Sequence, residues 1–267
     1  MVWGSGGVGV NQLQPECWIV DAGLIGYTSS LDLQRRLVEA RKSGAVPDVL
    51  LFCEHPHVIT LGRNGKMEHL RASDRLLAQM NVEFQPTDRG GDITYHGPGQ
   101  IVGYPILDLA QHRRDVRWYV EQLEEVMIRT TADFGVRAGR VEGRHGIWVD
   151  SSAGEQKLAA LGVRLSRWIT SHGFAYNVST DLRYFDLIVP CGITDRRATS
   201  LERILGRAVR GEEVRRCLAF HFGEVFAREM VFVTPGQLEE AVAGSNLPPE
   251  PFENTHAHAE AMKENRA

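Results

Sequence analysis

The chain has 267 residues, of which 43% are hydrophobic and 24% charged, and its formal net charge is −4. A chain of this length can bury a substantial core in one large or two small domains. The acidic balance argues against general nucleic-acid binding, and no stretch of about 18 apolar residues predicts a membrane-spanning helix.

Strand-like and helix-like segments alternate through the first half of the chain. A flexible N-terminus is predicted over residues 1–16. Gly4–Gly9 fit the motif GxGxxG, but no strand precedes them and no helix follows. A dinucleotide site is therefore not predicted there. The periodicity predicts helices over about 28–43 and 73–80, and strands over about 17–21, 48–53, 82–87 and 100–108. A polar segment punctuated by glycine connects the early elements at 62–68.

The second half continues the alternation. Asp115 is predicted to cap the longest helix, which runs to about Phe134 and ends at Gly135. Strands are expected at 147–149, 157–165 and 168–177, and a further helix at 212–228. Short connections of this kind predict an α/β (α+β) fold, a mixed sheet flanked by helices.

The domain organisation follows from this pattern and from composition. We expect one catalytic domain over 17–243, with a smaller C-terminal lobe from about 211. Residues 244–267 are rich in proline and charge, which predicts a disordered tail. His256 and His258 are interpreted as tail residues rather than metal ligands.

Four widely spaced cysteines indicate a reducing compartment, because they form neither a CxxC pair nor a disulfide scaffold. Cys17, Cys53 and Cys217 lie in strand-like or helix-like segments and are predicted to be buried structural thiols. The N-terminus shows no basic region followed by an apolar run, so no signal peptide is predicted. We therefore expect a cytoplasmic protein.

Cys191 differs from the other three cysteines in its surroundings. It lies between Pro190 and Gly192, and such a turn presents its sulfur for chemistry. Lys157, one of only four lysines, lies in a run of small and apolar residues, where burial favours the uncharged amine. A thiol beside such an amine points to covalent acyl transfer, in which a thiolate attacks a thioester and carries the acyl group.

The segment from Arg89 to Gln100 contains four glycines and predicts a binding loop on a strand edge. Its amides can hold an anion or a polar carbonyl. The alternative is an ordinary glycine-rich hairpin with His96 bonded to a backbone carbonyl. Arg89 either anchors a ligand carbonyl or forms a surface ion pair. His172 similarly either aims its imidazole at the thiol or caps a bulge.

Several other chemistries lack positive support in the sequence. GxxxxGK[ST], GxSxG and HExxH are all absent, so a phosphate loop, a serine hydrolase and a zinc protease are not predicted. Residues 113–210 carry 16 basic and 12 acidic side chains, whereas residues 211–267 carry 5 basic and 10 acidic. The basic middle segment either docks an acidic protein partner or forms ordinary solvated faces.

Three ordered blocks resemble the lipoyl(octanoyl) transferase family. They are Arg89–Gly103, then Lys157–Arg164 with Trp168–Val178, and then Asp186–Ile193 followed by Thr199–Leu201. The resemblance extends from about Ile19 to Met230. It implies a biotin/lipoate protein ligase-like catalytic domain that needs no free cofactor.

The resemblance also implies the reaction and the residues that carry it. A member of this family transfers an octanoyl group from octanoyl-acyl carrier protein to a lysine of a lipoyl domain, the first step of endogenous protein lipoylation. The implied acceptors are the lipoyl domains of 2-oxoacid dehydrogenase complexes and glycine cleavage H protein, with neither nucleic acid nor membrane involved. Cys191 matches the family's thioester nucleophile, and Lys157 matches the lysine that helps to ionise it and to transfer protons.

The implied acyl pocket comes from three stretches of the chain. Its residues are Arg89, Gly90, Gly91, Asp92, Ile93, Thr94, Tyr95, His96, Ala160, Leu161, Gly162, Gly173, Phe174 and Ala175. Leu158 and Tyr176 depart from the common family residues and are expected to reshape the pocket. Two other functions stay open: an ATP-dependent lipoate or biotin protein ligase with the same fold, and a non-catalytic acyl-carrier-binding protein.

Overall fold

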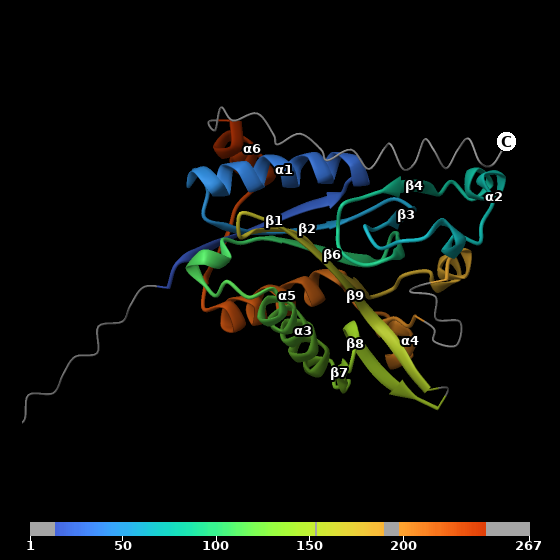
Figure 1. Ribbon diagram of the computed structural model, residues 1–267. Coiled ribbons are helices and arrows are strands. Elements are labelled where there is room, and N and C mark those ends of the chain that lie inside the picture. The colour runs from blue at the N-terminus through green and yellow to red at the C-terminus, as the bar shows by residue number, and fades with distance from the viewer. Residues whose placement is uncertain (1–13, 153, 190–197, 244–267) are drawn as a thin grey trace, which may run out of the picture.

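A large mixed sheet with helices on both faces forms the centre of the computed structural model, which describes residues 14–152, 154–189 and 198–243 (Figure 1). The strand order is β11 (Glu229–Phe232), β1 (Glu16–Leu24), β2 (Asp48–Glu54), β6 (Gln100–Ile106), β10 (Ile169–Asn177), β9 (Gly154–Ser166), β8 (Arg144–Ser151) and β7 (Ala138–Val141). Strand β1 runs parallel to both neighbours, and all other adjacent pairs are antiparallel. The predicted mixed sheet flanked by helices is therefore confirmed.

Helices cover the two faces of this sheet in pairs (Figure 1). One face packs against α1 (Tyr27–Ser43) and α6 (Pro235–Ala243), and the other against α3 (Val116–Asp133) and α5 (Gly211–Phe226). Strands β6 and β10 are buried along their whole length, as expected of central strands covered on both sides. The short helix α4 (Leu201–Leu205) precedes α5 in the chain.

The predicted capping of the longest helix is observed. The Asp115 side chain accepts a hydrogen bond from the main-chain N–H of Trp118 at 3.0 Å, which satisfies one of the free amides of the first turn. At the other end Gly135 adopts a φ of +76°, the left-handed conformation that follows many helices. The signals that mark the two ends of α3 are thus local in sequence.

A second, three-stranded sheet was predicted only in part, because the strand expected at 82–87 is present as β4 (Glu83–Pro86) but its pairing was not foreseen. The order of this sheet is β4, β3 (Val58–Leu61) and β5 (Ile93–His96). Helix α2 (Asp74–Gln79) and the 3₁₀ turns η1 (Met67–His69) and η3 (Leu182–Leu187) lie with it, around a small core of their own. A further 3₁₀ turn, η2 (Leu109–Gln111), precedes α3. The small sheet forms one wall of the pocket described below.

The C-terminal elements join the main sheet. Strand β11 pairs with β1, and α5 packs on α3, in the region where we expected a smaller lobe. Residues 1–13 and 244–267, for which we predicted a flexible N-terminus and a disordered tail, lie outside the described residues.

Two of the three predicted structural thiols are fully buried. Cys17 and Cys53 are 0% exposed, and burial raises the pKa of both thiols well above the usual range. Cys217 is only half-buried, so the prediction of a buried thiol was wrong there. It lies on the outward-facing part of α5, where the apolar face of the helix ends.

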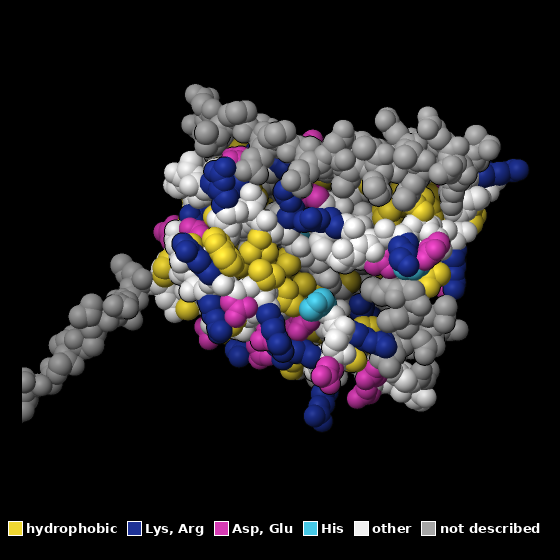
Figure 2. Space-filling view, viewed as in Figure 1, with side chains coloured by type: hydrophobic (Ala, Val, Ile, Leu, Met, Phe, Trp, Pro, Cys, Tyr) yellow, Lys and Arg dark blue, Asp and Glu magenta, His cyan; other side chains and the backbone are white. Residues whose placement is uncertain are grey.

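The surface is mixed in charge. On the face shown in Figure 2, Lys and Arg side chains are interspersed with Asp and Glu rather than gathered into one patch. Among the described residues, no helix is long and apolar enough to cross a bilayer.

Candidate functional site

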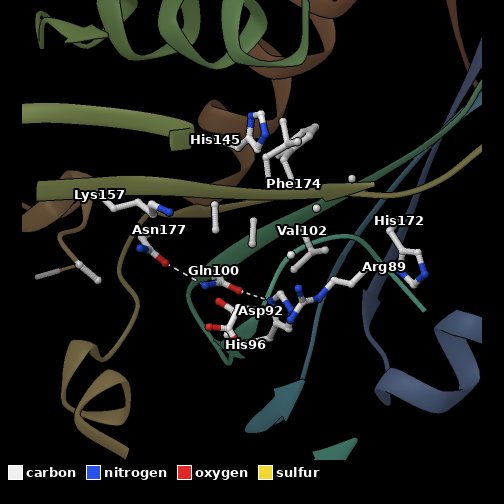
Figure 3. Close-up of a pocket in the computed structure, with 18 of the residues that line it drawn as sticks. Arg89, Asp92, His96, Gln100, Val102, His145, Lys157, His172, Phe174 and Asn177 are labelled. Atoms are coloured by element: carbon white, nitrogen blue, oxygen red, sulfur yellow. Dashed lines mark hydrogen bonds between the residues drawn. The ribbon is translucent and has the colours of Figure 1, made fainter. Parts of the chain in front are cut away.

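A pocket of about 430 Å³ lies between the main sheet, the small sheet and the β7–β8 turn (Figure 3). Strands β6, β9 and β10 supply its floor, and the loop from Arg89 to Asp92 supplies one side. Thirteen of the predicted site residues line it: Arg89, Gly91, Asp92, Ile93, Thr94, His96, Lys157, Ala160, Leu161, Gly162, Gly173, Phe174 and Ala175. Three blocks far apart in sequence therefore meet at one cavity.

Three predicted site residues are not among the pocket-lining residues. Gly90 turns its main-chain N–H to the carbonyl oxygen of Val163 at 3.0 Å, which ties the loop to β9. Tyr95 is fully buried beneath the pocket, with its hydroxyl 2.7 Å from Nδ1 of His57. Cys191 lies in 190–197, outside the described residues.

Lys157 enters the pocket from β9. It lies opposite Trp148 in the β8–β9 ladder, and its Nζ is 4.7 Å from the centre of the indole ring. Ala198 forms a parallel bridge to Lys157, and the N–H of Thr199 donates to the Lys157 carbonyl at 2.9 Å. The described chain therefore resumes at Ala198 directly beside this lysine.

Arg89 is a buried anchor of the loop. Its Nη2 donates to the carbonyl oxygen and the hydroxyl of Thr60 at 2.9 and 2.8 Å, and Nη1 donates to the carbonyl of Gly90 at 3.1 Å. The side chain lines the pocket but is only 8% exposed, so the alternative of a surface ion pair was wrong. The guanidinium instead joins the binding loop to β3.

Glycine is required where this loop meets its neighbours. A Cβ on Gly62 would collide with the Gly91 carbonyl oxygen and would lie 2.8 Å from Nη1 of Arg89. A Cβ on Gly162 would lie 2.7 Å from the Gly90 carbonyl oxygen. Only residues without a side chain allow this close approach of the backbones.

Asp92 links the loop to the segment that precedes Cys191. Nδ1 of His69 donates to its carboxylate at 2.6 Å, and the main-chain N–H of Lys66 donates to it at 3.3 Å. The His69 carbonyl in turn accepts from the N–H of Val189 at 2.8 Å. The last described residue before 190–197 is thus bonded to the pocket wall.

His172 is held by a carboxylate. Its Nε2–H donates to Asp88 at 2.7 Å, and its main-chain N–H donates to the side-chain oxygen of Gln34 at 2.8 Å. Its φ of +55° is unusual for a residue with a side chain. Burial lowers the pKa of the imidazole, although the bond to Asp88 opposes that shift. These contacts favour a structural role in the pocket wall.

His96 bonds a side chain and not the backbone carbonyl expected of a plain hairpin. Its Nδ1 lies 2.7 Å from the side-chain oxygen of Gln100, whose Nε2 donates to Oδ1 of Asn177 at 2.9 Å. Burial, together with nearby His55 and Arg89, lowers the pKa of His96 to about 3. The ring is therefore neutral at physiological pH.

Gln100, the last residue of the predicted 89–100 loop, also lines the pocket, whereas these lining residues were not singled out from the sequence: Tyr27, Val102, Tyr104, Gly143, Arg144, His145, Trp148, Asn177, Phe185 and Ala198. Two signals could have found some of them. Gln100, Val102 and Tyr104 alternate on one face of a strand, which follows the period of two. Arg144 and His145 begin β8 directly after the turn at Gly143, in a stretch punctuated by glycine. Nothing local marks Tyr27, which enters from the first turn of α1.

Leu158 and Tyr176 do not reshape the pocket, contrary to expectation. Both are fully buried in the core on the α3 face of the sheet. The Tyr176 hydroxyl lies 2.8 Å from the hydroxyl of Thr131 on α3. They point away from the cavity because successive side chains of a strand alternate between faces.

No metal site is evident in the part of the chain that the structure describes. There, no group of three or more His, Cys, Asp or Glu side chains could hold a metal ion. The acidic side chain in the pocket wall, Asp92, is already bonded to His69.

Comparisons with known proteins agree on one family. Residues 26–223 match the family model of the lipoyl protein ligase A/B catalytic domain. An octanoyltransferase of Solibacter usitatus is 52% identical over 215 residues, which cover 80% of this chain and 95% of that protein. An octanoyltransferase of Acidobacterium capsulatum is also 52% identical, over 82% of this chain and 94% of its own length.

Solved structures show the same fold at low identity. A bi-partite lipoate protein ligase from Thermoplasma acidophilum has a TM-score of 0.67 at 15% identity and covers 90% of this chain and 95% of that one. A lipoate-protein ligase A bound with ATP has a TM-score of 0.65 at 16% identity, over 87% of this chain and 93% of that one. The predicted ligase-like catalytic fold is thereby confirmed.

Proposed function

Because this chain is an acyltransferase belonging to the lipoyl(octanoyl) transferase family, we propose that it transfers an octanoyl group from octanoyl-acyl carrier protein to a lipoyl-domain lysine, through a Cys191 thioester. In the first half-reaction the Cys191 thiolate attacks the thioester carbonyl carbon. The bond from that carbon to the carrier sulfur breaks, and the carrier leaves as a thiol. In the second, the lysine amine attacks the new thioester, an amide forms, and the Cys191 thiol is regenerated.

Lys157 moves the proton in both half-reactions. It accepts the thiol proton from Cys191 and passes it to the departing carrier sulfur. In the second half-reaction it accepts a proton from the attacking amine and returns it to the Cys191 sulfur. No ATP, metal ion or redox cofactor enters this balance.

One observation carries the proposal: the two described ends of the 190–197 segment flank the pocket that Lys157 enters. Ala198 bridges to Lys157 itself, and Val189 is bonded to His69, whose ring donates to Asp92. Cys191 is two residues beyond Val189, and two residues span at most about 7 Å. This reach supports a thiol at the rim of the same pocket.

The pocket lining suits an acyl chain. Val102, Leu161 and Phe174 contribute apolar surface, while Ala160 and Ala175 leave room above the sheet. Apolar walls with a few polar groups at one end are typical of small-molecule sites. The octanoyl chain is proposed to lie along β9 and β10, with its thioester at the Lys157 end.

The proposed acceptors are lipoyl domains of 2-oxoacid dehydrogenase complexes and glycine cleavage H protein. The similar Thermoplasma acidophilum ligase was studied with its E2 lipoyl domain, which supports an acceptor of this class. The proposal places the reaction in the cytoplasm, as the first step of endogenous protein lipoylation.

Intact-mass spectrometry after incubation with octanoyl-acyl carrier protein tests the mechanism. Wild-type protein and Cys217→Ala, which removes a half-buried thiol elsewhere, should gain one octanoyl group. Cys191→Ala should gain none, and adding lipoyl domain should clear the wild-type adduct. An adduct that persists in Cys191→Ala, or octanoylation that requires octanoate and ATP, would reject the thioester mechanism.

A further inference from the structure

A chain of three hydrogen bonds runs along the pocket wall, and Figure 3 shows the two that join His96, Gln100 and Asn177. Nδ1 of His96 lies 2.7 Å from Oε1 of Gln100, Nε2 of Gln100 is 2.9 Å from Oδ1 of Asn177, and Nδ2 of Asn177 is 2.9 Å from the Thr199 carbonyl oxygen. All four residues are at least nine-tenths buried. Water therefore does not compete for these bonds.

The direction of every bond follows from the last acceptor. The Thr199 carbonyl can only accept, so Asn177 must present its amide nitrogen there and its oxygen to Gln100. Gln100 must then donate with Nε2, which also lies 3.3 Å from the Tyr95 carbonyl, and accept with Oε1. The proton of neutral His96 consequently belongs on Nδ1, which leaves Nε2 as a bare acceptor.

The surroundings keep this imidazole neutral. His55 and Tyr27 pack on it with ring centres 5.9 and 6.1 Å away, and Arg89 and His172 are the other charged or titratable groups nearby. Burial, the positive charge of Arg89 and the repulsion that a protonated His55 or His172 would add outweigh the bond to Gln100. Nε2 can therefore accept a hydrogen bond at neutral pH but is a poor base.

These three hydrogen bonds form a relay that begins at Thr199, beside Lys157, and ends at His96 in the pocket. The N–H of Thr199 donates to the Lys157 carbonyl at 2.9 Å, and His96 and Lys157 line the same cavity. Within the described residues, Nε2 of His96 has no hydrogen-bond partner. An octanoyl chain has no N–H or O–H to offer it, whereas an attacking amine does.

We propose that Gln100 and Asn177 are positioning residues that fix His96 so that its Nε2 accepts an N–H from the acceptor lysine during transfer. This inference rests on the proposed function and assigns the relay to its second half-reaction. A weakly basic nitrogen orients the amine without taking its proton. That proton remains available to Lys157, and the amine lone pair faces the thioester.

Separate measurement of the two half-reactions tests this assignment. Gln100→Met removes both amide contacts at similar volume. We expect octanoyl loading from the carrier protein within about twofold of wild type and transfer to lipoyl domain slowed roughly tenfold, as for one lost orienting hydrogen bond. Tyr176→Phe, which deletes a buried hydroxyl on the opposite face of β10, is the matched control and should change neither rate.

A conservative variant separates positioning from mere support of the fold. Gln100→Glu keeps an oxygen acceptor for Nδ1–H but loses the donor to Asn177 and Tyr95, so transfer at pH 8 should fall less than in Gln100→Met. Its carboxylate should raise the pKa of His96, so transfer should fall more steeply than in wild type as the pH drops to 6. Nitrogen-15 NMR of the His96 ring should show the Nδ1–H tautomer in wild type and Gln100→Glu, and lose it in Gln100→Met.

Three results would overturn the inference. They are an Nε2–H tautomer in wild type, equal slowing of loading and transfer in Gln100→Met, or no slowing of either. Equal slowing of loading and transfer would indicate that Nε2 of His96 contacts an amide of the carrier's pantetheine arm instead. Failure of wild type to load at all would instead refute the thioester mechanism, so the two proposals fail in distinguishable ways.

Discussion

Lys157 lies against the face of Trp148, with its Nζ 4.7 Å from the centre of the indole ring, and the two residues are direct neighbours across the β8–β9 ladder. Trp148 is only 6% exposed, so the ring is a fixed surface beneath the amine. The guanidinium of Arg144 lies 5.8 Å from the same ring. The face of the indole thus packs against the amine and helps to hold the lysine in place.

Replacing this ring should slow octanoyl loading. A cation over an aromatic face gains about 0.5–2 kcal/mol, so Trp148→Leu should load roughly fivefold more slowly, while Trp148→Phe should retain most of the rate. The time course of the octanoyl adduct by intact mass measures this. Thermal unfolding of both variants controls for the lost volume, and equal loading by Leu and Phe variants would contradict a role for the ring face.

Gly62→Ala should disable the site without touching a catalytic group. The added methyl would strike the Gly91 carbonyl and the Arg89 side chain, so the loop must move away from Gly62 at the end of β3. We expect at least a tenfold fall in octanoyl loading, because displacements of about 1 Å cost that much or more in catalysis. Gly139→Ala, where a Cβ meets nothing within 4 Å, is the control and should load normally.

The main sheet and its helices were predictable because their signals are local. Asp115 and Gly135 mark the two ends of α3 by capping, and the apolar run of β2 is typical of a central strand. The small sheet was not, because β3 and β4 pair across a gap of more than twenty residues and each has only four residues. The strand predicted at 82–87 matches β4, whereas the four residues of β3 carry too little periodicity to be recognised alone.

The candidate site, too, was predictable from the sequence only in part. The glycines of the 89–100 loop and the isolated Lys157 stand out in the sequence, and the structure brings the loop and the lysine to one pocket. The contact of Gln100 with Asn177 depends on the β6–β10 register, which is fixed by tertiary pairing. Tyr27 reaches the pocket only because α1 packs across the sheet.

Buried neutral histidines should make stability fall as the solution is acidified. Burial lowers the pKa of His55 to about 4, although its bond to the Ile25 carbonyl opposes this, and an unfolded histidine titrates near 6.5. Between these values the unfolded chain binds a proton that the folded chain does not. His55 should therefore cost roughly 1.4 kcal/mol of unfolding free energy per pH unit as pH falls from about 6 to about 4.5.

Urea unfolding at several pH values checks this slope. His55→Gln loses the hydrogen bonds of the imidazole ring at every pH. Its stability should nevertheless fall less steeply with acidification than that of wild type. His145→Gln is the matched control, because His145 is exposed and its ring is solvated in folded and unfolded chains alike. Parallel curves for wild type and His55→Gln would show that His55 is not the group responsible.

Asp48 should be the most costly single charge to remove. Its carboxylate accepts bonds at 2.9–3.0 Å from Arg41, His112, Arg228 and the main-chain N–H of Asp108, which joins α1, η2 and the start of β11. Burial alone would raise the pKa of Asp48, but these donors outweigh it and hold the pKa well below the usual range. Asp48→Ala should therefore lower the unfolding free energy by about 3–5 kcal/mol, because it leaves buried cations unpaired.

The same cluster should set the acid limit of the fold. The depressed pKa means that Asp48 stabilises the folded chain fully above about pH 4 and loses that contribution as the pH falls further, since the unfolded carboxyl binds a proton first. Asp48→Asn should flatten the stability curve below pH 4. Glu239→Gln is the control: its pair with Arg36 is about half exposed, so its loss should cost under about 1 kcal/mol. Comparable losses of unfolding free energy in Asp48→Asn and Glu239→Gln would show that burial does not strengthen the interactions of Asp48.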